Sequence, residues 1–341
     1  MREQPDSILR GVMKAIFVLT FVFSSAFFAI GQETGGLLAP SRTVSLPLVQ
    51  GGLNHMSVDA RRERLFVAAP SDKILEVIDL KAGKLLLSLE GERPAAALYA
   101  PEFDQLYVSR GQGVSIYDGK TLKLLASIDL QTNADELRYD PRARELYAGC
   151  MGADKTGIAI IAIPEGKLLA KIALPGKPQG FAVEQNGSRI FANLPDQRQI
   201  AVLDRKKRLV LQQWPLQDVQ GNTPIALDEA SKRLFVGARR PATLVVLDTG
   251  TGKQVAEIGI DGDTDDLFYD SGNRRIYVSC GVGFIDVIQQ DDADHYRFLG
   301  RIATASGART STFSAQLNKF FLGAPRHVDQ PAEIRIFEAV K

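Results

Sequence analysis

Residues 224–253, with the sequence PIALDEASKRLFVGARRPATLVVLDTGTGK, decide the fold. A short apolar segment comes first and ends at a polar turn residue, Asp228. An apolar–aromatic–apolar triplet follows around Phe235, and a further apolar segment then ends in the acid Asp248 before a Gly-Lys turn. Short apolar runs bounded by turn residues predict antiparallel strands rather than helices.

The same pattern recurs along the chain with a nearly constant period. The central aromatic residues of the triplets lie 40 to 44 residues apart and are Phe66, Tyr107, Tyr147, Phe191, Phe235, Tyr277 and Phe321. Seven residues before them lie Asp59, Ala100, Asp140, Glu184, Asp228, Asp270 and Ser314. Six of these seven are polar, as expected where a side chain accepts hydrogen bonds from the backbone of a hairpin turn.

Each repeat offers four short strands, and a single four-stranded sheet cannot bury both of its faces. Radial stacking of such sheets solves this problem, and a period of about 40–45 residues is typical of β-propellers. Residues 42–48 (RTVSLPL) resemble the fourth strands of other repeats, whereas the seventh repeat ends after its third strand. We therefore predict that residues 32–341 form one all-β domain, a seven-bladed β-propeller closed by an N-terminal strand that completes the last blade.

The repeats resemble those of the YVTN-type (YncE-like) β-propeller family. The best matches are residues 178–193 (PQGFAVEQNGSRIFAN), 224–237 (PIALDEASKRLFVG) and 246–253 (VLDTGTGK). The third and sixth repeats depart from the family pattern, because the terminal acid is displaced or lost. The resemblance covers essentially all of residues 32–341 and implies the propeller fold. It implies little about function, because the matching residues belong to turns and the core.

Residues 1–31 have the layout of a secretory signal peptide. Arg2, Arg10 and Lys14 form a positively charged segment before an apolar run over residues 15–30, and the small residues at positions 29 and 31 suit a cleavage site. The alternative is an uncleaved anchor, although this run is short for a membrane span of about 20 residues. We predict a periplasmic or secreted protein with no stable membrane insertion after cleavage.

Composition and charge narrow the classes of function. The 341 residues are 45% hydrophobic and 24% charged, with a net charge of +1, which is ordinary globular composition. Residues 32–341 hold 38 residues of each sign, so nucleic-acid binding is disfavoured. Cys150 and Cys280 occupy equivalent positions in the third and sixth repeats. Blades so far apart in a seven-membered ring cannot be bridged by a disulfide, so we predict two free thiols.

The candidate binding residues lie where the innermost strand of each blade is expected to begin. Twelve residues before the core aromatics the sequence varies: Asn54, Ala95, Asp135, Gln179, Thr223, Asp265 and Arg309. Variation inside an otherwise regular repeat is expected at a binding face. We predict a ligand site at one mouth of the channel, formed by His55, Arg93, Asp135, Glu136, Gln179, Asn222, Asp265, Asp266 and Arg309. The alternative is a solvated funnel without a specific ligand.

We expect no cofactor and no metal site. The acidic run at residues 261–266 lacks the later glutamate of a calcium loop and is interpreted as a solvated turn between blades. His55, His295 and His327 fall in different repeats without metal-ligand spacing. Haem-attachment, P-loop and Gly-x-Ser-x-Gly motifs are absent. The single Trp214 argues against a quinone cofactor, since quinoprotein propellers repeat a tryptophan in their blades.

Two functions remain after these exclusions. The leading hypothesis is a non-catalytic, monomeric binding or scaffold protein that recognises a small molecule or a protein partner at the channel mouth. The alternative is a lactonase-like hydrolase that uses the same polar channel site, because such enzymes also place charged groups in a propeller channel. No catalytic residue can be matched to a motif, and fold alone does not decide between these functions.

Overall fold

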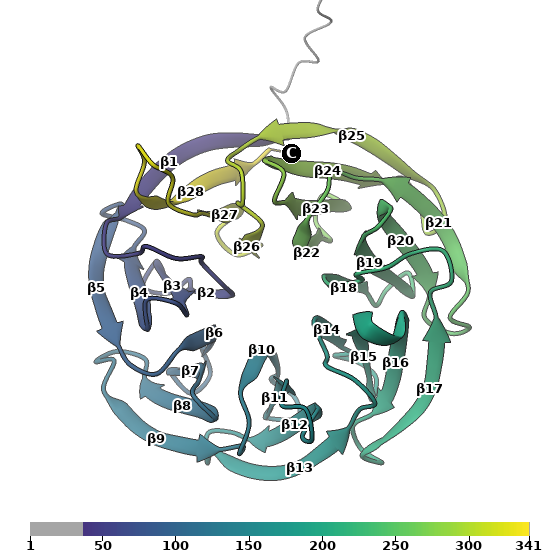
Figure 1. Cartoon of the computed structure of the whole chain (residues 1–341), viewed down its shortest axis with the longest axis horizontal. Coiled ribbons are helices and arrows are strands. Elements are labelled where there is room, and N and C mark those ends of the chain that lie inside the picture. The colour runs from purple at the N-terminus through teal and green to yellow at the C-terminus, as the bar shows by residue number, and fades with distance from the viewer. Residues whose placement is uncertain (1–36, 341) are drawn as a thin grey trace, which may run out of the picture. The chain divides into compact units, whose positions relative to one another are not determined.

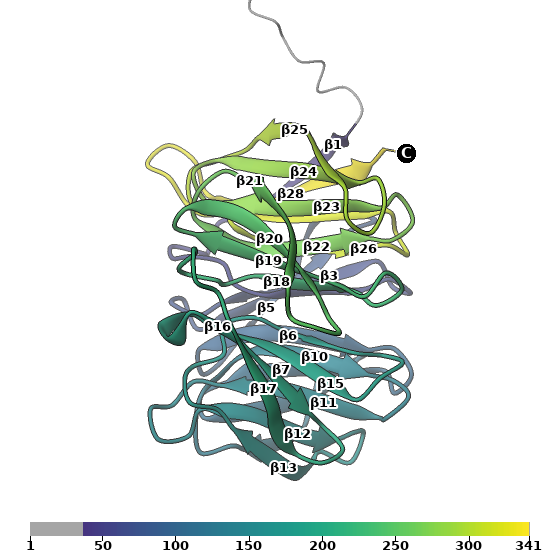
Figure 2. The same ribbon diagram turned by 90° about the vertical axis from the view of Figure 1, so that its right-hand side faces the viewer.

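The computed structural model describes residues 37–340, so the predicted signal peptide at residues 1–31 lies outside the described residues. The described chain forms seven four-stranded antiparallel sheets, arranged as blades around a central channel (Figure 1). Figure 2 shows the ring from the side, with the sheets of neighbouring blades packed face to face. The prediction of an all-β, seven-bladed β-propeller is therefore confirmed.

The strands follow the chain around the ring, from the channel outward in each blade. Blade 1 contains β2 (Met56–Asp59), β3 (Arg64–Ala69), β4 (Ile74–Asp79) and β5 (Lys84–Glu90). Blade 2 contains β6 (Pro94–Ala100), β7 (Gln105–Arg110), β8 (Gly113–Asp118) and β9 (Leu124–Asp129). Blade 3 contains β10 (Ala134–Asp140), β11 (Glu145–Cys150), β12 (Gly157–Ala162) and β13 (Lys167–Ala173). Blade 4 contains β14 (Phe181–Val183), β15 (Arg189–Leu194), a 3-10 turn (Pro195–Gln197), β16 (Gln199–Asp204) and β17 (Leu209–Pro215).

The remaining three blades repeat this order. Blade 5 contains β18 (Ile225–Asp228), β19 (Arg233–Arg239), β20 (Ala242–Asp248) and β21 (Gln254–Gly259). Blade 6 contains β22 (Thr264–Asp270), β23 (Arg275–Cys280), β24 (Phe284–Gln290) and β25 (Tyr296–Ala303). Blade 7 combines β26 (Thr310–Ser314), β27 (Lys319–Ala324) and β28 (Ala332–Ala339) with β1 (Leu38–Leu46) from the other end of the described chain.

The predicted turn residues close the inner hairpins. The carboxylate of Asp59 accepts hydrogen bonds from the backbone N–H groups of Arg61 and Arg62, at 3.1 and 3.2 Å. Asp140 accepts the N–H of Arg142 at 2.8 Å in the same way. An acid at this position therefore caps a tight turn, which explains why it recurs at a fixed distance from the core aromatic residue.

The central aromatic residues of the repeats form the core between blades. All seven side chains are buried. Phe66 of blade 1 packs with Leu106 of blade 2, and Phe191 of blade 4 packs with Leu234 of blade 5. The ring closes in the same manner, because Phe321 of blade 7 packs with the apolar residues of blade 1. Each blade thus buries one face of its neighbour, which is why a single repeat is not a stable unit.

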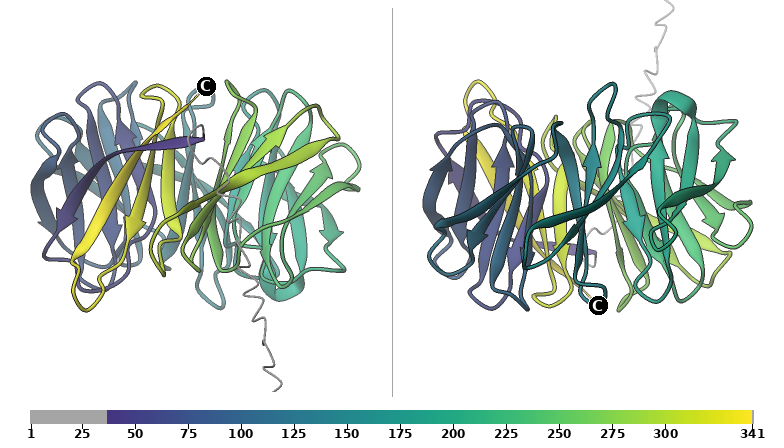
Figure 3. Two further views of the ribbon diagram at one scale, coloured as in Figure 1. Left: turned by 90° about the horizontal axis from the view of Figure 1, so that it is seen from above. Right: turned by 90° about the horizontal axis from the view of Figure 1, so that it is seen from below.

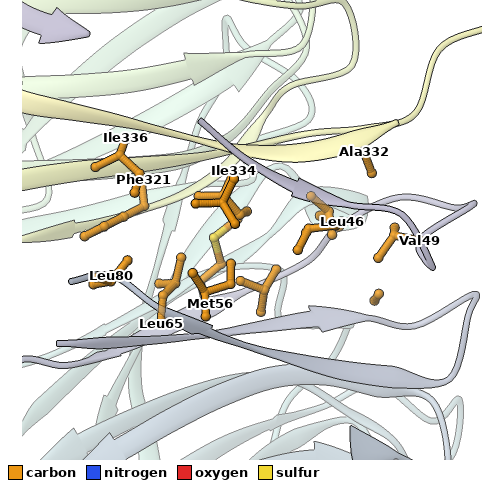
Figure 4. Packing of buried hydrophobic residues seen from close by; sticks show 14 of the residues in the cluster. Leu46, Val49, Met56, Leu65, Leu80, Phe321, Ala332, Ile334 and Ile336 are labelled. Atoms are coloured by element: carbon orange, nitrogen blue, oxygen red, sulfur yellow. The ribbon is translucent and has the colours of Figure 1, made fainter. Parts of the chain in front are cut away.

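The N-terminal strand completes the last blade, as predicted. β1 pairs antiparallel with β28, from Leu38 opposite Ala339 to Leu46 opposite Ala332. Figure 3 shows this strand, in purple, against the yellow C-terminal strand. Leu46 is fully buried, in the same cluster as Phe321, at the interface between blades 7 and 1 (Figure 4). The two ends of the domain are therefore joined by a β-ladder, which gives blade 7 its fourth strand.

Candidate functional site

A cavity of about 200 Å³, which we call the mouth cavity, lies at the end of the channel where the inner strands begin. Its lining is formed by Asn54, His55, Asp135, Glu136, Arg138, Gln179, Gly180, Thr223, Pro224, Ile225, Arg239, Asp265, Asp266, Leu267 and Arg309. Seven of the nine predicted site residues are among them: His55, Asp135, Glu136, Gln179, Asp265, Asp266 and Arg309. These seven come from blades 1, 3, 4, 6 and 7, so closure of the ring brings them together.

An ion pair crosses the channel between blade 1 and blade 6. Nδ1 of His55 lies 3.4 Å from Oδ1 of Asp266, and the two side chains are only 17% and 7% exposed. Burial alone would lower the pKa of His55, but the charge and hydrogen bond of Asp266 and the charges of Glu136 and Asp135 raise it to about 10. The imidazole is therefore a cation at neutral pH.

Two acids at equivalent positions each serve both the fold and the cavity. Glu136 accepts the backbone N–H of Phe181 in the next blade at 2.9 Å, and its other oxygen pairs with Arg138. Asp266 accepts the N–H of Ser311 in its next blade at 2.7 Å, and its other oxygen faces His55. Each carboxylate thus satisfies a buried backbone donor and presents charge to the channel.

The ion-paired side chains of blades 1, 3 and 6 form a polar layer across the channel, made of His55, Glu136, Arg138 and Asp266. A second cavity of about 230 Å³ is lined further along the inner strands by residues such as Ser57 and Leu98. It shares His55, Glu136, Arg138 and Asp266 with the mouth cavity. The ion-paired layer therefore separates the mouth of the channel from its interior.

A second network of charges lines the mouth cavity on blades 5 to 7. Arg239 donates to Asp265 at 2.8 Å, and Nε of Arg309 lies 3.4 Å from the same carboxylate. Arg309 also donates to both oxygens of Asp263, at 2.8 and 2.9 Å. Of the acidic run at residues 261–266, only residues 261–263 belong to the connection between β21 and β22, whereas Asp265 and Asp266 lie in β22. The expectation of a solvated turn is therefore wrong for Asp265, which is part of a strand and pairs with arginine side chains.

Two carboxyl groups on the cavity wall have raised pKa values. Burial raises the pKa of Asp265, and the neighbouring charge of Asp266 raises it further, against the charges of His55, Arg239 and Arg309. Burial likewise raises the pKa of Glu136. Such shifts arise where a carboxylate loses hydration, and they are common at binding and catalytic sites.

Two predicted site residues lie outside the mouth cavity. Asn222 is fully buried, and its amide donates to Oδ1 of Asn193 at 3.0 Å and to the carbonyl of Gln199 at 3.2 Å. It therefore joins blades 4 and 5, and the cavity is lined instead by its neighbour Thr223. Arg93 lines an adjacent cavity of about 520 Å³, which also contains Asn54 and Asp135.

Sequence reasoning missed Arg138 and Arg239 as cavity residues. Arg138 follows Glu136 by two residues on β10, so both side chains lie on the same face of that strand. This alternation is a signal that could have identified Arg138. Arg239 ends β19, the second strand of blade 5, and reaches the cavity by pairing with blade 6. No local pattern indicates that contact.

Metal and membrane features are described for residues 37–340. In this range no group of three or more His, Cys, Asp or Glu side chains could hold a metal ion. The same residues contain no helix long and apolar enough to cross a membrane. Cys150 and Cys280 are buried and not bonded to each other, so the prediction of two free thiols is confirmed.

Comparison with known sequences finds one distant homologue. No model of a known protein family matches the chain. Over 237 residues, the chain is 28% identical to "Antigen Lp49" of Leptospira interrogans serogroup Icterohaemorrhagiae serovar copenhageni (strain Fiocruz L1-130). The match covers 66% of this chain and 51% of the relative, so the chain matches about half the length of that protein.

Comparison with solved structures supports the propeller. A chain from the crystal structure of a mitotic checkpoint complex is similar with a TM-score of 0.76, at 13% identity, covering 98% of this chain and 99% of that chain. A chain of Kuenenia stuttgartiensis hydrazine synthase is similar with a TM-score of 0.70, at 14% identity, covering 80% and 92%. At such identities the likeness concerns the fold alone.

Proposed function

We propose that this protein is an exported, monomeric β-propeller binding protein of the YVTN type that recognises a small polar molecule or a protein partner at the channel mouth. The observation that carries the proposal is the convergence of seven charged or polar side chains from five blades on one cavity. A solvated funnel needs no such arrangement, because dispersed polar residues would suffice to keep it wet.

The chemistry of the mouth cavity suits recognition by hydrogen bonds and charge. Most of its lining residues lie in or just before the inner strands of a closed ring, and Glu136, Asp265 and Asp266 are each held by a hydrogen bond or an ion pair. Side chains that are fixed before binding lose little conformational entropy when a ligand arrives. The cavity of about 200 Å³ admits a small molecule or one polar side chain of a partner protein.

The proposal that the protein is exported rests on the first 31 residues. A positively charged start, an apolar run and small residues before position 32 favour secretion to the periplasm or beyond. A direct measurement is the N-terminal residue of the protein isolated from the host's periplasm or culture medium, which we expect to be Gln32.

A lactonase-like hydrolase is the second candidate. Glu136 and Asp265 favour it, because carboxyl groups with raised pKa values can act as general acids or bases. His55 is unsuited to act as a base near neutral pH, because Asp266 keeps it protonated. Hydrolysis of a sugar lactone releases a proton, so a pH-stat assay with Glu136→Gln and Asp265→Asn variants tests this candidate directly.

Thermal shift with a ligand series tests the binding proposal. Metal ions, sugar lactones and cell-wall fragments are the first probes, and a ligand at 100 times its Kd stabilises the fold by about 2.7 kcal/mol. Arg309→Glu adds a carboxylate beside Asp263 and Asp265, so we expect it to abolish the shift. Arg326→Glu is the control, since Arg326 is exposed and lies outside the mouth-cavity lining.

Two outcomes separate the candidates. A shift that survives both Arg309→Glu and Asp135→Asn contradicts the proposed site, because both residues line the mouth cavity. Turnover of a lactone that is lost in Glu136→Gln or Asp265→Asn favours the hydrolase instead of the binding protein.

A further inference from the structure

The adjacent cavity of about 520 Å³, which we call the side cavity, has the size of a ligand pocket. It is lined by residues from blades 1 to 3, which include Asn54, Arg93, Gln112, Asn133 and Asp135. Asn54 and Asp135 belong to both cavities, and the amide of Asn54 donates to Asp135 at 3.2 Å. The side cavity therefore continues directly from the mouth cavity.

Asp135 differs from the other carboxylates of the mouth cavity. Glu136, Asp265 and Asp266 each pair with an arginine or histidine. Within residues 37–340, Asp135 forms no ion pair, and its partner is the neutral amide of Asn54. The charge of Asp135 contributes to the raised pKa of His55, but no cation among residues 37–340 forms an ion pair with it.

Arg93 is the matching unpaired cation. Its guanidinium has no hydrogen-bond or ion-pair partner among the described residues 37–340, and it lines the side cavity with Asp135. Arg93 and Asp135 do not pair with each other, although both face the same cavity. The cavity thus presents one uncompensated positive and one uncompensated negative charge.

The remaining polar lining consists mostly of amides. The side-chain amides of Gln112 and Asn133 have no partner in the described part of the chain, and both residues are exposed at the cavity. An amide offers both a donor and an acceptor, which matches the N–H and C=O groups of a peptide unit. A peptide bond between two charged ends would therefore find complementary groups.

We propose that the side cavity binds a zwitterion with an ammonium and a carboxylate group, an amino acid or a short peptide with free termini. The ammonium pairs with Asp135, the carboxylate pairs with Arg93, and the amides of Gln112 and Asn133 bind the atoms between them. This inference rests on the proposed binding function and specifies its ligand. A neutral sugar would leave both charges unpaired, and a simple cation or anion would leave one.

Blocked peptides test the two charges separately. Isothermal titration calorimetry on the chain from residue 32 compares L-alanyl-L-alanine with its N-acetylated form, which lacks the cation, and its C-terminal amide, which lacks the anion. A hydrogen bond to a charged group contributes enough that we expect each blocked peptide to bind at least about tenfold more weakly. Absence of dipeptide binding up to about 10 mM overturns the inference.

Two variants assign the charges to residues. In Arg93→Gln, the dipeptide and its C-terminal amide should bind equally, because the carboxylate has lost its partner. In Asp135→Asn, the dipeptide and its N-acetylated form should bind equally. Arg326→Gln and Asp154→Asn are matched controls at exposed positions outside both cavities and should retain full discrimination. Discrimination that persists in Arg93→Gln and Asp135→Asn refutes the assignment.

Failure of this inference can be told from failure of the proposed function. A lactone or other non-zwitterion whose binding is lost in Arg309→Glu would keep the binding function and overturn the zwitterion. If no probe of any class binds, both are overturned. Dipeptide binding that responds to Arg93→Gln and Asp135→Asn supports both.

Discussion

Leu46→Ala tests how strongly the N-terminal strand holds the ring closed. Leu46 is fully buried between blades 7 and 1, beside Phe321 and Ile334, whereas Ser45 on the other face of β1 is exposed. Truncation of a buried leucine removes packing and leaves a void, which costs about 2–5 kcal/mol. We expect the variant to fold, because the strand keeps its backbone pairing with β28.

The expected change in melting temperature follows from the size of the domain. Unfolding entropy is about 2.1 cal/mol/K per residue, or roughly 0.6 kcal/mol/K for about 300 residues. A loss of about 2–5 kcal/mol therefore lowers Tm by about 3–8 °C, which differential scanning calorimetry resolves easily. Ser45→Ala is the matched control and should shift Tm by less than about 1 °C.

A wider deletion extends the same reasoning. Removal of residues 40–50 takes away most of β1 and exposes the edge of β28 to other chains. We expect a far larger drop in Tm and association that size-exclusion chromatography detects. If Leu46→Ala has the same Tm as the wild-type protein, β1 does not hold the ring closed. The same conclusion follows if Ser45→Ala lowers Tm as much as Leu46→Ala does.

Two further predictions concern buried groups. The pKa of His55 rises from 6.5 to about 10 in the folded protein, so its ion pair contributes fully below about pH 6.5 and is lost as the pH rises through about 10. The free energy of unfolding, measured by denaturation at pH 6 and pH 10, should decrease less between these pH values for His55→Gln than for wild type. Equal decreases would contradict the ion pair. Burial raises the pKa of the Cys150 and Cys280 thiols, so an alkylating reagent should modify both only after unfolding. Rapid labelling of the native protein, read by mass spectrometry, would be inconsistent with their burial.

Local patterns predicted the repeated features of the fold. Asp59 and its equivalents are identifiable because a turn acid bonds to backbone two or three residues away. Phe235 and its equivalents are identifiable because each repeat must bury the same face. The buried aromatic residue recurs in every blade and the turn acid in five of the seven, so their spacing along the chain is nearly constant.

The candidate site was predicted only in part. Asn222 and Thr223 are adjacent, and their side chains face different surroundings, so an error of one position selected the buried residue. Arg239 was missed because its partner Asp265 belongs to the next blade. A long arginine side chain can point in several directions, and contacts with the neighbouring blade decide which orientation it adopts.

The sequence by itself determined the number of blades, their strand order and the closure by residues near the N-terminus, because those features depend on periodic burial and local turns. Only the tertiary structure decided which charges meet across the channel. His55 pairs with Asp266 over a separation of 211 positions, while Asp135 and Arg93 have no ionic partner within residues 37–340. Ion pairing depends on distances of a few ångströms between blades, and no spacing along the chain encodes those distances.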